Sequence, residues 1–230
     1  MKATYLAIAG FSLLGLFSCK EEKEKPKVSY DTPKVKIEVP KPDTTSVEIA
    51  DLPIQITGTD YLIHPIGNMR SYERSGNMSY TISNYGEFEI AGFLTNLKFQ
   101  KTDSDSLAVL TDKPVLIQTA TYLKAFADKG RPQIIAYTLS DIDTNKDGKI
   151  DASDIKTLYL STISGENFTK VSADFQELID WKLIESKNRL YFRTIEDSNK
   201  NGEFDKDDAV HYNYVELGAK SWETTPYKPL

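Results

Sequence analysis

The chain has 230 residues, of which 28 are Lys or Arg and 34 are Asp or Glu, so its formal net charge is −6. This acidic balance argues against a nucleic-acid partner, because proteins that bind nucleic acids present basic patches to the phosphates. A single cysteine excludes an internal disulfide framework, and two histidines leave little for histidine-dependent catalysis. A mean hydropathy of −0.42 excludes a polytopic membrane protein. We therefore expect a protein that is not an enzyme.

Residues 1–18 form a predicted signal peptide. Lys2 supplies a positive charge, and the apolar run that follows is too short for a transmembrane helix. The run ends in Leu16-Phe17-Ser18-Cys19, which resembles the lipobox of bacterial lipoproteins. That resemblance implies that Cys19 becomes the first mature residue and carries the lipid (palmitate) that anchors the chain to a membrane. The alternative is a general secretory signal followed by an incidental cysteine.

The next segment, residues 19–46, has the composition of a lipid-anchored, charged linker. It opens with Lys-Glu-Glu-Lys-Glu at residues 20–24, which resembles the signal that sends some Gram-negative lipoproteins to the outer face of the outer membrane. The resemblance implies a surface-exposed lipoprotein, and the alternative is a solvated charge run. Proline recurs through the rest of the segment, as in a semi-rigid spacer. Within it, Val35, Ile37 and Val39 alternate and are compatible with a short edge strand.

From residue 47 to residue 230 the sequence predicts one mainly-β domain with antiparallel strands and little helix. β-Branched and aromatic residues alternate with polar ones, which is the pattern of half-buried strands. The predicted strands are residues 88–93, 96–100, 115–122, 133–139, 157–161, 181–185, 190–195 and 210–217. Residues 186–188 are expected to form a hairpin turn. Helical spacing predicts a short helix over residues 174–183 and, more weakly, over residues 120–128.

The domain also contains an internal repeat. Residues 133–160 and 189–214 each consist of an aromatic-rich strand, an acidic loop and a second aromatic-rich strand, with Asp143 matching Asp197 at an offset of 54 residues. Residues 164–172 resemble the outer hairpin of TolB-like β-propeller repeats, and the loose resemblance extends over residues 115–217. It implies antiparallel meanders or a reduced propeller-like blade array, because a full propeller does not fit this length. An irregular β-sandwich is the alternative.

The first acidic loop, residues 143–154, resembles the calcium loop of EF-hand and dockerin proteins. Calcium takes six to eight oxygen ligands, so oxygen-bearing residues must converge from a short stretch of chain. In the resemblance Gly148 allows the sharp turn and Lys149 offers its carbonyl oxygen. Asp154 stands at the closing position, where EF-hands more often have Glu. The predicted ligands are Asp143, Asn145, Asp147, Lys149, Asp151 and Asp154.

The second loop, residues 197–208, repeats this pattern. Its predicted ligands are Asp197, Asn199, Asn201, Glu203, Asp205 and Asp208. Asn201 stands where the first loop has Asp147, so the second loop supplies fewer carboxylates. Because calcium affinity rises with ligand charge, we expect two calcium sites, the first tighter than the second. The alternative for each loop is an acidic, solvated turn without an ion.

The flanks of the loops indicate what the calcium does. A sensor EF-hand needs helices on both sides, whereas strand sequences flank these two loops. The sequence therefore predicts structural calcium between antiparallel strands. His64 and His211 lack the neighbours of a metal site or a catalytic triad.

The function that follows is that of a lipid-anchored outer-membrane or cell-surface protein. It would act as an extracellular binding or interaction module whose partner is an unidentified protein or glycan. One alternative is a surface glycan-handling accessory protein, which a ring of exposed Trp and Tyr around a groove would favour and which quenching of Trp181 and Trp222 fluorescence by oligosaccharides would support. The other is a hydrolase, which requires paired carboxylates outside the loops.

Overall fold

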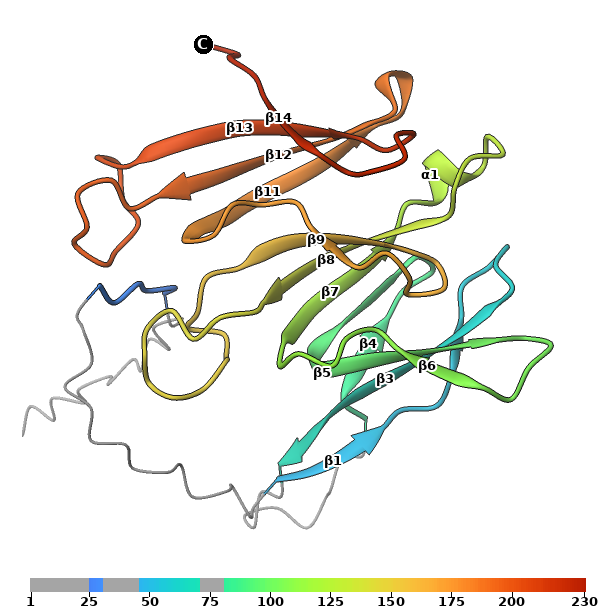
Figure 1. Cartoon of the computed structure of the whole chain (residues 1–230). Helices are drawn as coiled ribbons and strands as arrows, with labels where there is room; N and C mark the ends of the chain where they lie inside the picture. Colours follow the sequence, from blue (N-terminus) through green and yellow to red (C-terminus); the bar gives the residue numbers. More distant parts are fainter. Residues whose placement is uncertain (1–24, 31–45, 71–80) are drawn as a thin grey trace, which may run out of the picture.

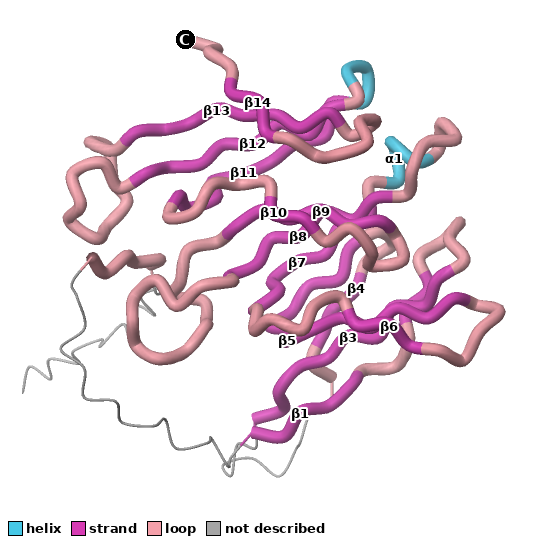
Figure 2. Tube along the Cα trace, viewed as in Figure 1, coloured by secondary structure: helices cyan, strands magenta, loops and turns pink. Residues whose placement is uncertain are grey.

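The computed structural model describes residues 25–30, 46–70 and 81–230. In this part the chain is mainly β and its strands pair in antiparallel fashion, which confirms the predicted fold class of antiparallel meanders (Figure 2). The predicted signal peptide, Cys19, residues 20–24 and the predicted edge strand around Ile37 lie outside the described residues. Across the described ranges, the structure contains no helix long and apolar enough to cross a membrane.

The described strands form two sheets (Figure 1). The large sheet has the order β1-β3-β5-β7-β8-β9-β10, with β2 beside β3 and with β4 and β6 beside β5. Its strands are β1 (Ser46–Ala50), β2 (Ile54–Gln55), β3 (Tyr61–Arg70), β4 (Ser83–Tyr85), β5 (Glu89–Lys101), β6 (Leu107–Val109), β7 (Leu116–Tyr122), β8 (Ile134–Ser140), β9 (Thr157–Thr162) and β10 (Thr169–Lys170). The small sheet has the order β11 (Gln176–Ile184), β12 (Arg189–Glu196), β13 (Ala209–Glu216) and β14 (Thr224–Pro226).

Two hydrophobic cores hold these sheets, and strand β8 contributes to both. Side chains alternate between the two faces of a strand, so neighbouring residues point in opposite directions. Ile135 and Tyr137 lie in the core that the large sheet wraps around. Ile134 and Ala136 lie in the second core, together with Phe192 of the small sheet. The small sheet is therefore packed on the back of β8 and β9, and a burial pattern without exposed positions in β8 follows from that arrangement.

Two sequence predictions are wrong in detail. The segment predicted as a helix over residues 174–183 is strand β11. A register shift between Leu178 and Asp180 leaves both Ile179 and Asp180 exposed, so a β-bulge breaks the two-residue alternation that identifies a strand. The strands predicted at 88–93 and 96–100 are one strand, β5, whose pairing with β7 shifts between Ala91 and Leu94.

The remaining local predictions agree better with the structure. The weaker helical segment contains the short helix α1 (Lys124–Ala127). The turn predicted at residues 186–188 joins β11 to β12, through the 3₁₀ turn η1 (Glu185–Lys187) and Asn188, which has φ of 55°. The repeat is visible as two hairpins, β8–β9 in the large sheet and β12–β13 in the small sheet. The acidic loops of both hairpins lie at the same end of the molecule (Figure 1).

Candidate functional site

The first acidic loop is folded around its own side-chain oxygens. Asp143 accepts hydrogen bonds from the N–H of Asp147 (3.1 Å, to Oδ1) and of Gly148 (2.8 Å, to Oδ2). Asn145 Oδ1 accepts the N–H of Asp147 at 2.9 Å, and Asp147 Oδ1 accepts the N–H of Lys149 at 2.9 Å. Short polar side chains that accept N–H groups two residues ahead produce tight turns. The sequence of this loop thus determines its conformation locally.

Asp154 closes the loop from its far end. Its Oδ1 accepts the N–H of Thr144 (2.7 Å) and of Asn145 (3.3 Å), and its Oδ2 accepts the N–H of Asp151 (2.9 Å). The residue has a relative exposure of 0%. A buried carboxylate is stable only where donors surround it, and here the backbone of the loop supplies them. Asp154 therefore holds the two ends of the loop together.

The second loop repeats nearly all of these hydrogen bonds. Each hydrogen bond just described, apart from the long one from Asn145, has a counterpart 54 residues later at 2.7–3.1 Å. The backbone agrees as well, because Gly148 and Gly202 have φ of 89° and 86°, and Lys146 and Lys200 have φ of 61° and 58°. Two loops with different neighbours adopt one conformation, so the shared sequence pattern is its cause.

The loops contain the donor set that calcium prefers. Each carboxylate oxygen that accepts one N–H group retains a second lone pair for a cation. In both loops the predicted ligands are carboxylate, amide or backbone oxygens, and the side chains of Lys149 and Glu203 are exposed, as expected where only the carbonyl binds. Within the described ranges, however, no three His, Cys, Asp or Glu side chains are gathered as a metal-holding group. Binding of calcium would therefore draw the acidic side chains inward.

Both ends of the first loop are fixed by ion pairs. At the start of the loop, Asp141 accepts hydrogen bonds from Lys170 Nζ (2.8 Å) and from the Tyr159 hydroxyl (2.7 Å). At its end, Lys156 Nζ lies 2.6 Å from Glu177 Oε1, and the Lys156 N–H donates to Glu177 Oε2 at 2.7 Å. Burial raises the pKa of Glu177, which is 6% exposed. Because Glu177 belongs to β11, this pair also joins the loop to the small sheet.

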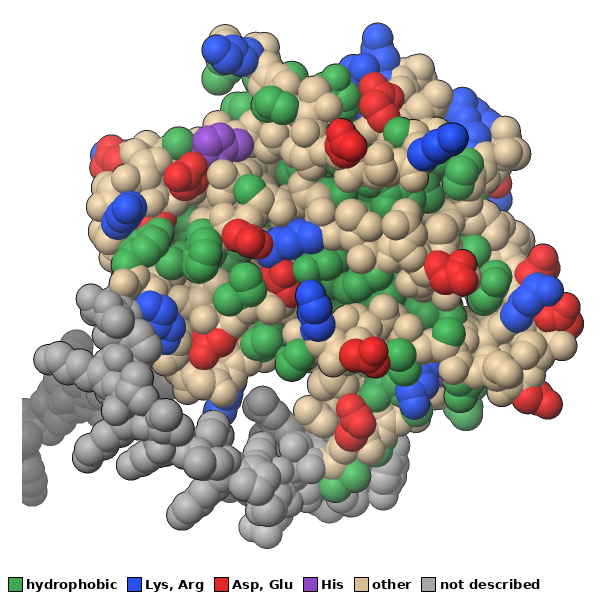
Figure 3. All heavy atoms as spheres, in the orientation of Figure 1, with side chains coloured by type: hydrophobic (Ala, Val, Ile, Leu, Met, Phe, Trp, Pro, Cys, Tyr) green, Lys and Arg blue, Asp and Glu red, His purple; other side chains and the backbone are tan. Residues whose placement is uncertain are grey.

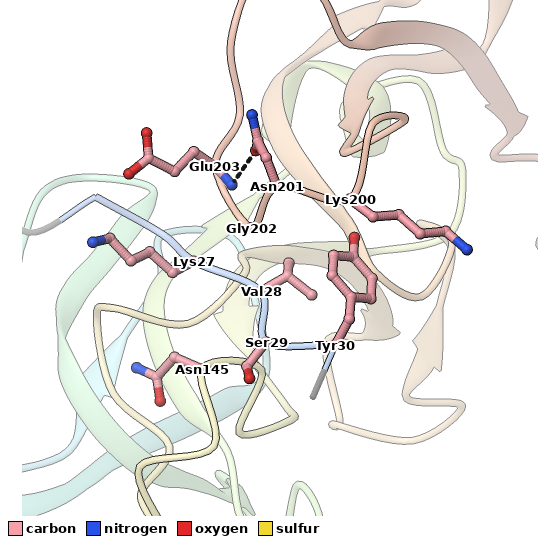
Figure 4. A pocket seen from close by; sticks show the side chains of 9 residues that line it. All are labelled: Lys27, Val28, Ser29, Tyr30, Asn145, Lys200, Asn201, Gly202 and Glu203. Carbon is pink, nitrogen blue, oxygen red and sulfur yellow. Dashed lines mark hydrogen bonds between the residues drawn. The ribbon is translucent and has the colours of Figure 1, made fainter. Parts of the chain in front are cut away.

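A segment far away in the sequence, residues 25–30, lies between the two loops, and we call it the strap (Figures 1 and 4). Successive N–H groups of an extended chain point in opposite directions. The N–H of Lys27 donates to Ser153 O (3.1 Å) and that of Ser29 to Thr144 O (2.8 Å), both in the first loop. The N–H of Val28 donates to Gly202 O (3.1 Å) in the second loop. The strap is therefore bonded to a loop on each side.

Side chains strengthen this contact. Val28 is only 5% exposed. The hydroxyl of Tyr30 is hydrogen-bonded to the carboxylate of Asp197, the first predicted ligand of the second loop. Burial and this acceptor together raise the pKa of Tyr30 to about 12. A polar pocket of about 350 Å³ remains between the strap and the loops, and Figure 4 shows the side chains of Lys27 and Lys200 pointing away from each other around it.

The strap was not predicted, because the whole of residues 19–46 has a linker composition. Pro26 and the neighbouring charges suppress any strand signal. The available signal was the spacing of Val28 and Tyr30, two apolar residues on alternate positions within a charged stretch. The contact depends on residues more than 110 positions away, so no local pattern specifies it.

The tryptophan, tyrosine and histidine side chains considered for ligand binding or catalysis are packed or hydrogen-bonded within the domain. Trp222 is 9% exposed and lies in the second core, so the two tryptophans do not form one exposed face. Tyr191, Tyr214 and Tyr227 pack against one another, and the guanidinium of Arg189 lies 4.0 Å from the Tyr214 ring centroid. The histidines pair with single side chains, His64 with Gln100 (2.9 Å) and His211 with Glu196 (2.8 Å).

Acidic and basic side chains are interspersed over the face seen in Figure 3. Comparison with protein-family models, with curated proteins and with solved structures finds no match to this chain. The mainly-β fold and the paired acidic loops are therefore the features from which a function has to be argued.

Proposed function

We propose that this chain is a lipid-anchored protein of the cell surface whose β domain holds structural calcium in its two hairpin loops. It acts as an extracellular binding or interaction module, anchored to the outer membrane through Cys19. The observation that carries the calcium part is the repetition of one loop conformation, hydrogen bond for hydrogen bond, at residues 143–154 and 197–208. In both loops this conformation gathers carboxylate and amide oxygens in one short stretch of chain, which is the donor set that calcium binds.

Calcium would stabilise the domain by mass action. At about 1 mM calcium and a dissociation constant of about 10–100 μM, each site contributes roughly 1.4–2.7 kcal/mol. This is a large share of the few kcal/mol by which a domain is stable. The loops join adjacent strands, so the ion would neutralise clustered carboxylates where a hairpin reverses. That position supports a structural role and not a switch.

Calorimetric titration of the mature chain with calcium tests the proposal. We expect two binding events, of which Asp143→Ala removes the tighter and Asp197→Ala the weaker, because each variant loses the carboxylate at the first loop position. Excess chelator should lower the melting temperature by roughly 6–22 °C, because both sites together contribute about 2.8–5.4 kcal/mol and each kcal/mol corresponds to about 2–4 °C. Asp105→Ala, which removes an exposed charge outside both loops, is the control and should change neither result. A single event, none, or a melting temperature insensitive to chelator contradicts the two-site proposal.

The lipid anchor is tested separately. Cys19→Ala should leave the signal peptide uncleaved or release the protein from the membrane fraction, because no thiol remains to carry the lipid. Fractionation and the mass of the mature N-terminal peptide measure this outcome. Ser12→Ala, a change within the apolar run, is the control and should leave processing intact. Membrane association that is unchanged after Cys19→Ala would show that Cys19 is not the anchor.

A further inference from the structure

The strap contacts each loop beside its predicted calcium ligands. In the first loop its partners are Thr144, which lies between two ligands, and Ser153, which precedes Asp154. In the second loop its partners are the carbonyl of Gly202 and the carboxylate of Asp197. A conformational change in either loop would therefore move the acceptors that hold the strap.

We propose that residues 25–30 couple the two calcium sites, so that calcium in one loop raises the affinity of the other. This inference rests on the proposed calcium function. Calcium that orders the first loop fixes two of the acceptors for the strap, and the docked strap then limits the freedom of the second loop. Coupling between sites is reciprocal, so calcium in the second loop must favour the first equally. Typical couplings change affinity by about 5- to 150-fold.

The two glycines at the sixth loop position show that the strap is fitted to the second loop. Both have a positive φ, so a side chain is strained at either position. A Cβ at Gly202 would lie 2.7 Å from the carbonyl oxygen of Val28, whereas a Cβ at Gly148 would have nothing within 4 Å. Both Gly148→Ala and Gly202→Ala strain the backbone of a loop, but only Gly202→Ala also places a Cβ against the strap. Comparing the two variants therefore separates the contact with the strap from the strain within a loop.

The position of the strap explains how a conformational change in one loop can reach the other. The first loop closes a hairpin of the large sheet and the second closes a hairpin of the small sheet. The strap is bonded to both, through the alternating N–H groups of three consecutive residues. Thr144 reinforces the first-loop side, because its hydroxyl lies 3.0 Å from Lys27 O. The strap is a direct bridge between the loops, with no sheet rearrangement needed.

Calcium isotherms of the mature chain test the coupling. The unmodified protein should bind two ions with a Hill coefficient above one. Val28→Pro removes the N–H group that bonds to Gly202 while remaining compatible with an extended chain. It should leave two binding events, with a Hill coefficient no greater than one and half-saturation at about 2- to 12-fold higher calcium, because half-saturation of two sites shifts with the square root of the coupling factor. An unchanged Hill coefficient in Val28→Pro, or independent binding in the unmodified protein, overturns the coupling. Absence of any calcium binding in the unmodified protein overturns the proposed function itself.

Limited trypsin digestion gives a second readout that does not need cooperativity. Trypsin cleaves after Lys27 only when the strap leaves the loops, since a docked backbone cannot enter a protease. Calcium should slow this cleavage about 10-fold in the unmodified protein, and the protection should be larger the more strongly the two sites are coupled. Gly202→Ala should speed the cleavage more than Gly148→Ala does, because both variants strain a loop but only a Cβ at Gly202 collides with the carbonyl oxygen of Val28. Equal cleavage in both variants, or no effect of calcium where calcium binds, contradicts the proposal.

Discussion

Asp154→Ala is expected to lower the free energy of unfolding by about 2–4 kcal/mol, even in the presence of chelator. The substitution removes a fully buried carboxylate and leaves the N–H groups of Thr144, Asn145 and Asp151 without their acceptor. Each buried donor left unsatisfied costs about 1–3 kcal/mol, and partial relaxation of the loop limits the sum. Urea denaturation in chelator measures the loss.

Asp208→Ala, at the same position of the second loop, is the matched variant. Asp208 accepts the N–H groups of Ser198 and Asp205 but is partly exposed, so water can replace it. We expect a loss of about 0.5–1.5 kcal/mol. Equal losses for the two variants in chelator would show that burial does not determine the role of Asp154. A loss that appears only when calcium is present would assign Asp154 to the ion alone.

Gly165→Ala is expected to lower the free energy of unfolding by about 2–5 kcal/mol. Gly165 has φ of 81° and lies at the turn between β9 and β10, where an added Cβ would overlap the ring of Phe99. Phe99 is 2% exposed in the first core and has no space to move into. A side chain in the left-handed region costs about 1–2 kcal/mol, and overpacking a core costs about 1–3 kcal/mol. Thermal and urea denaturation measure the combined effect.

Gly130→Ala provides the comparison for the backbone contribution. Gly130 has φ of 70°, and a Cβ there would meet nothing within 4 Å. Its substitution should therefore lower the free energy of unfolding only by the strain of a side chain in the left-handed region, about 1–2 kcal/mol. The difference between the two variants reports the collision with Phe99. Equal costs would indicate that the hairpin tip moves away from the first core without loss.

The sequence predicts the strands well where apolar and polar residues alternate along the whole strand. Buried and less buried residues alternate along β12, and the predicted ranges of β12 and β13 agree with the structure to within a few residues. β11 was mistaken for a helix because its bulge changes the phase of burial between Leu178 and Asp180. The spacing of apolar residues along a segment contains no information on such a register shift, which depends on pairing with β12. A register shift also explains why the sequence predicts two strands where the structure has β5 alone, because the shift interrupts the alternation of β5 between Ala91 and Leu94.

The loops and the strap differ in how far the sequence determines them. Asp143, Asn145 and Asp147 bond to N–H groups within five residues, so the loop conformation could be predicted from the loop itself. The partners of Lys27 and Val28 lie in two hairpins that come together only when the sheets pack. The binding of calcium stays a prediction.

If Cys19 carries a lipid as proposed, the position of the strap limits how far the domain can lie from the membrane. If the lipid is on Cys19, six Cα-to-Cα steps separate it from Lys25, a reach of at most about 20 Å. The linker between the lipid and the domain would then be much shorter than residues 19–46 suggest. The end of the domain that carries the two loops would have to stay close to the bilayer. Tension on the anchor would reach one hairpin in each sheet at once, so a pulling force would be shared between both sheets instead of peeling away a single terminal strand.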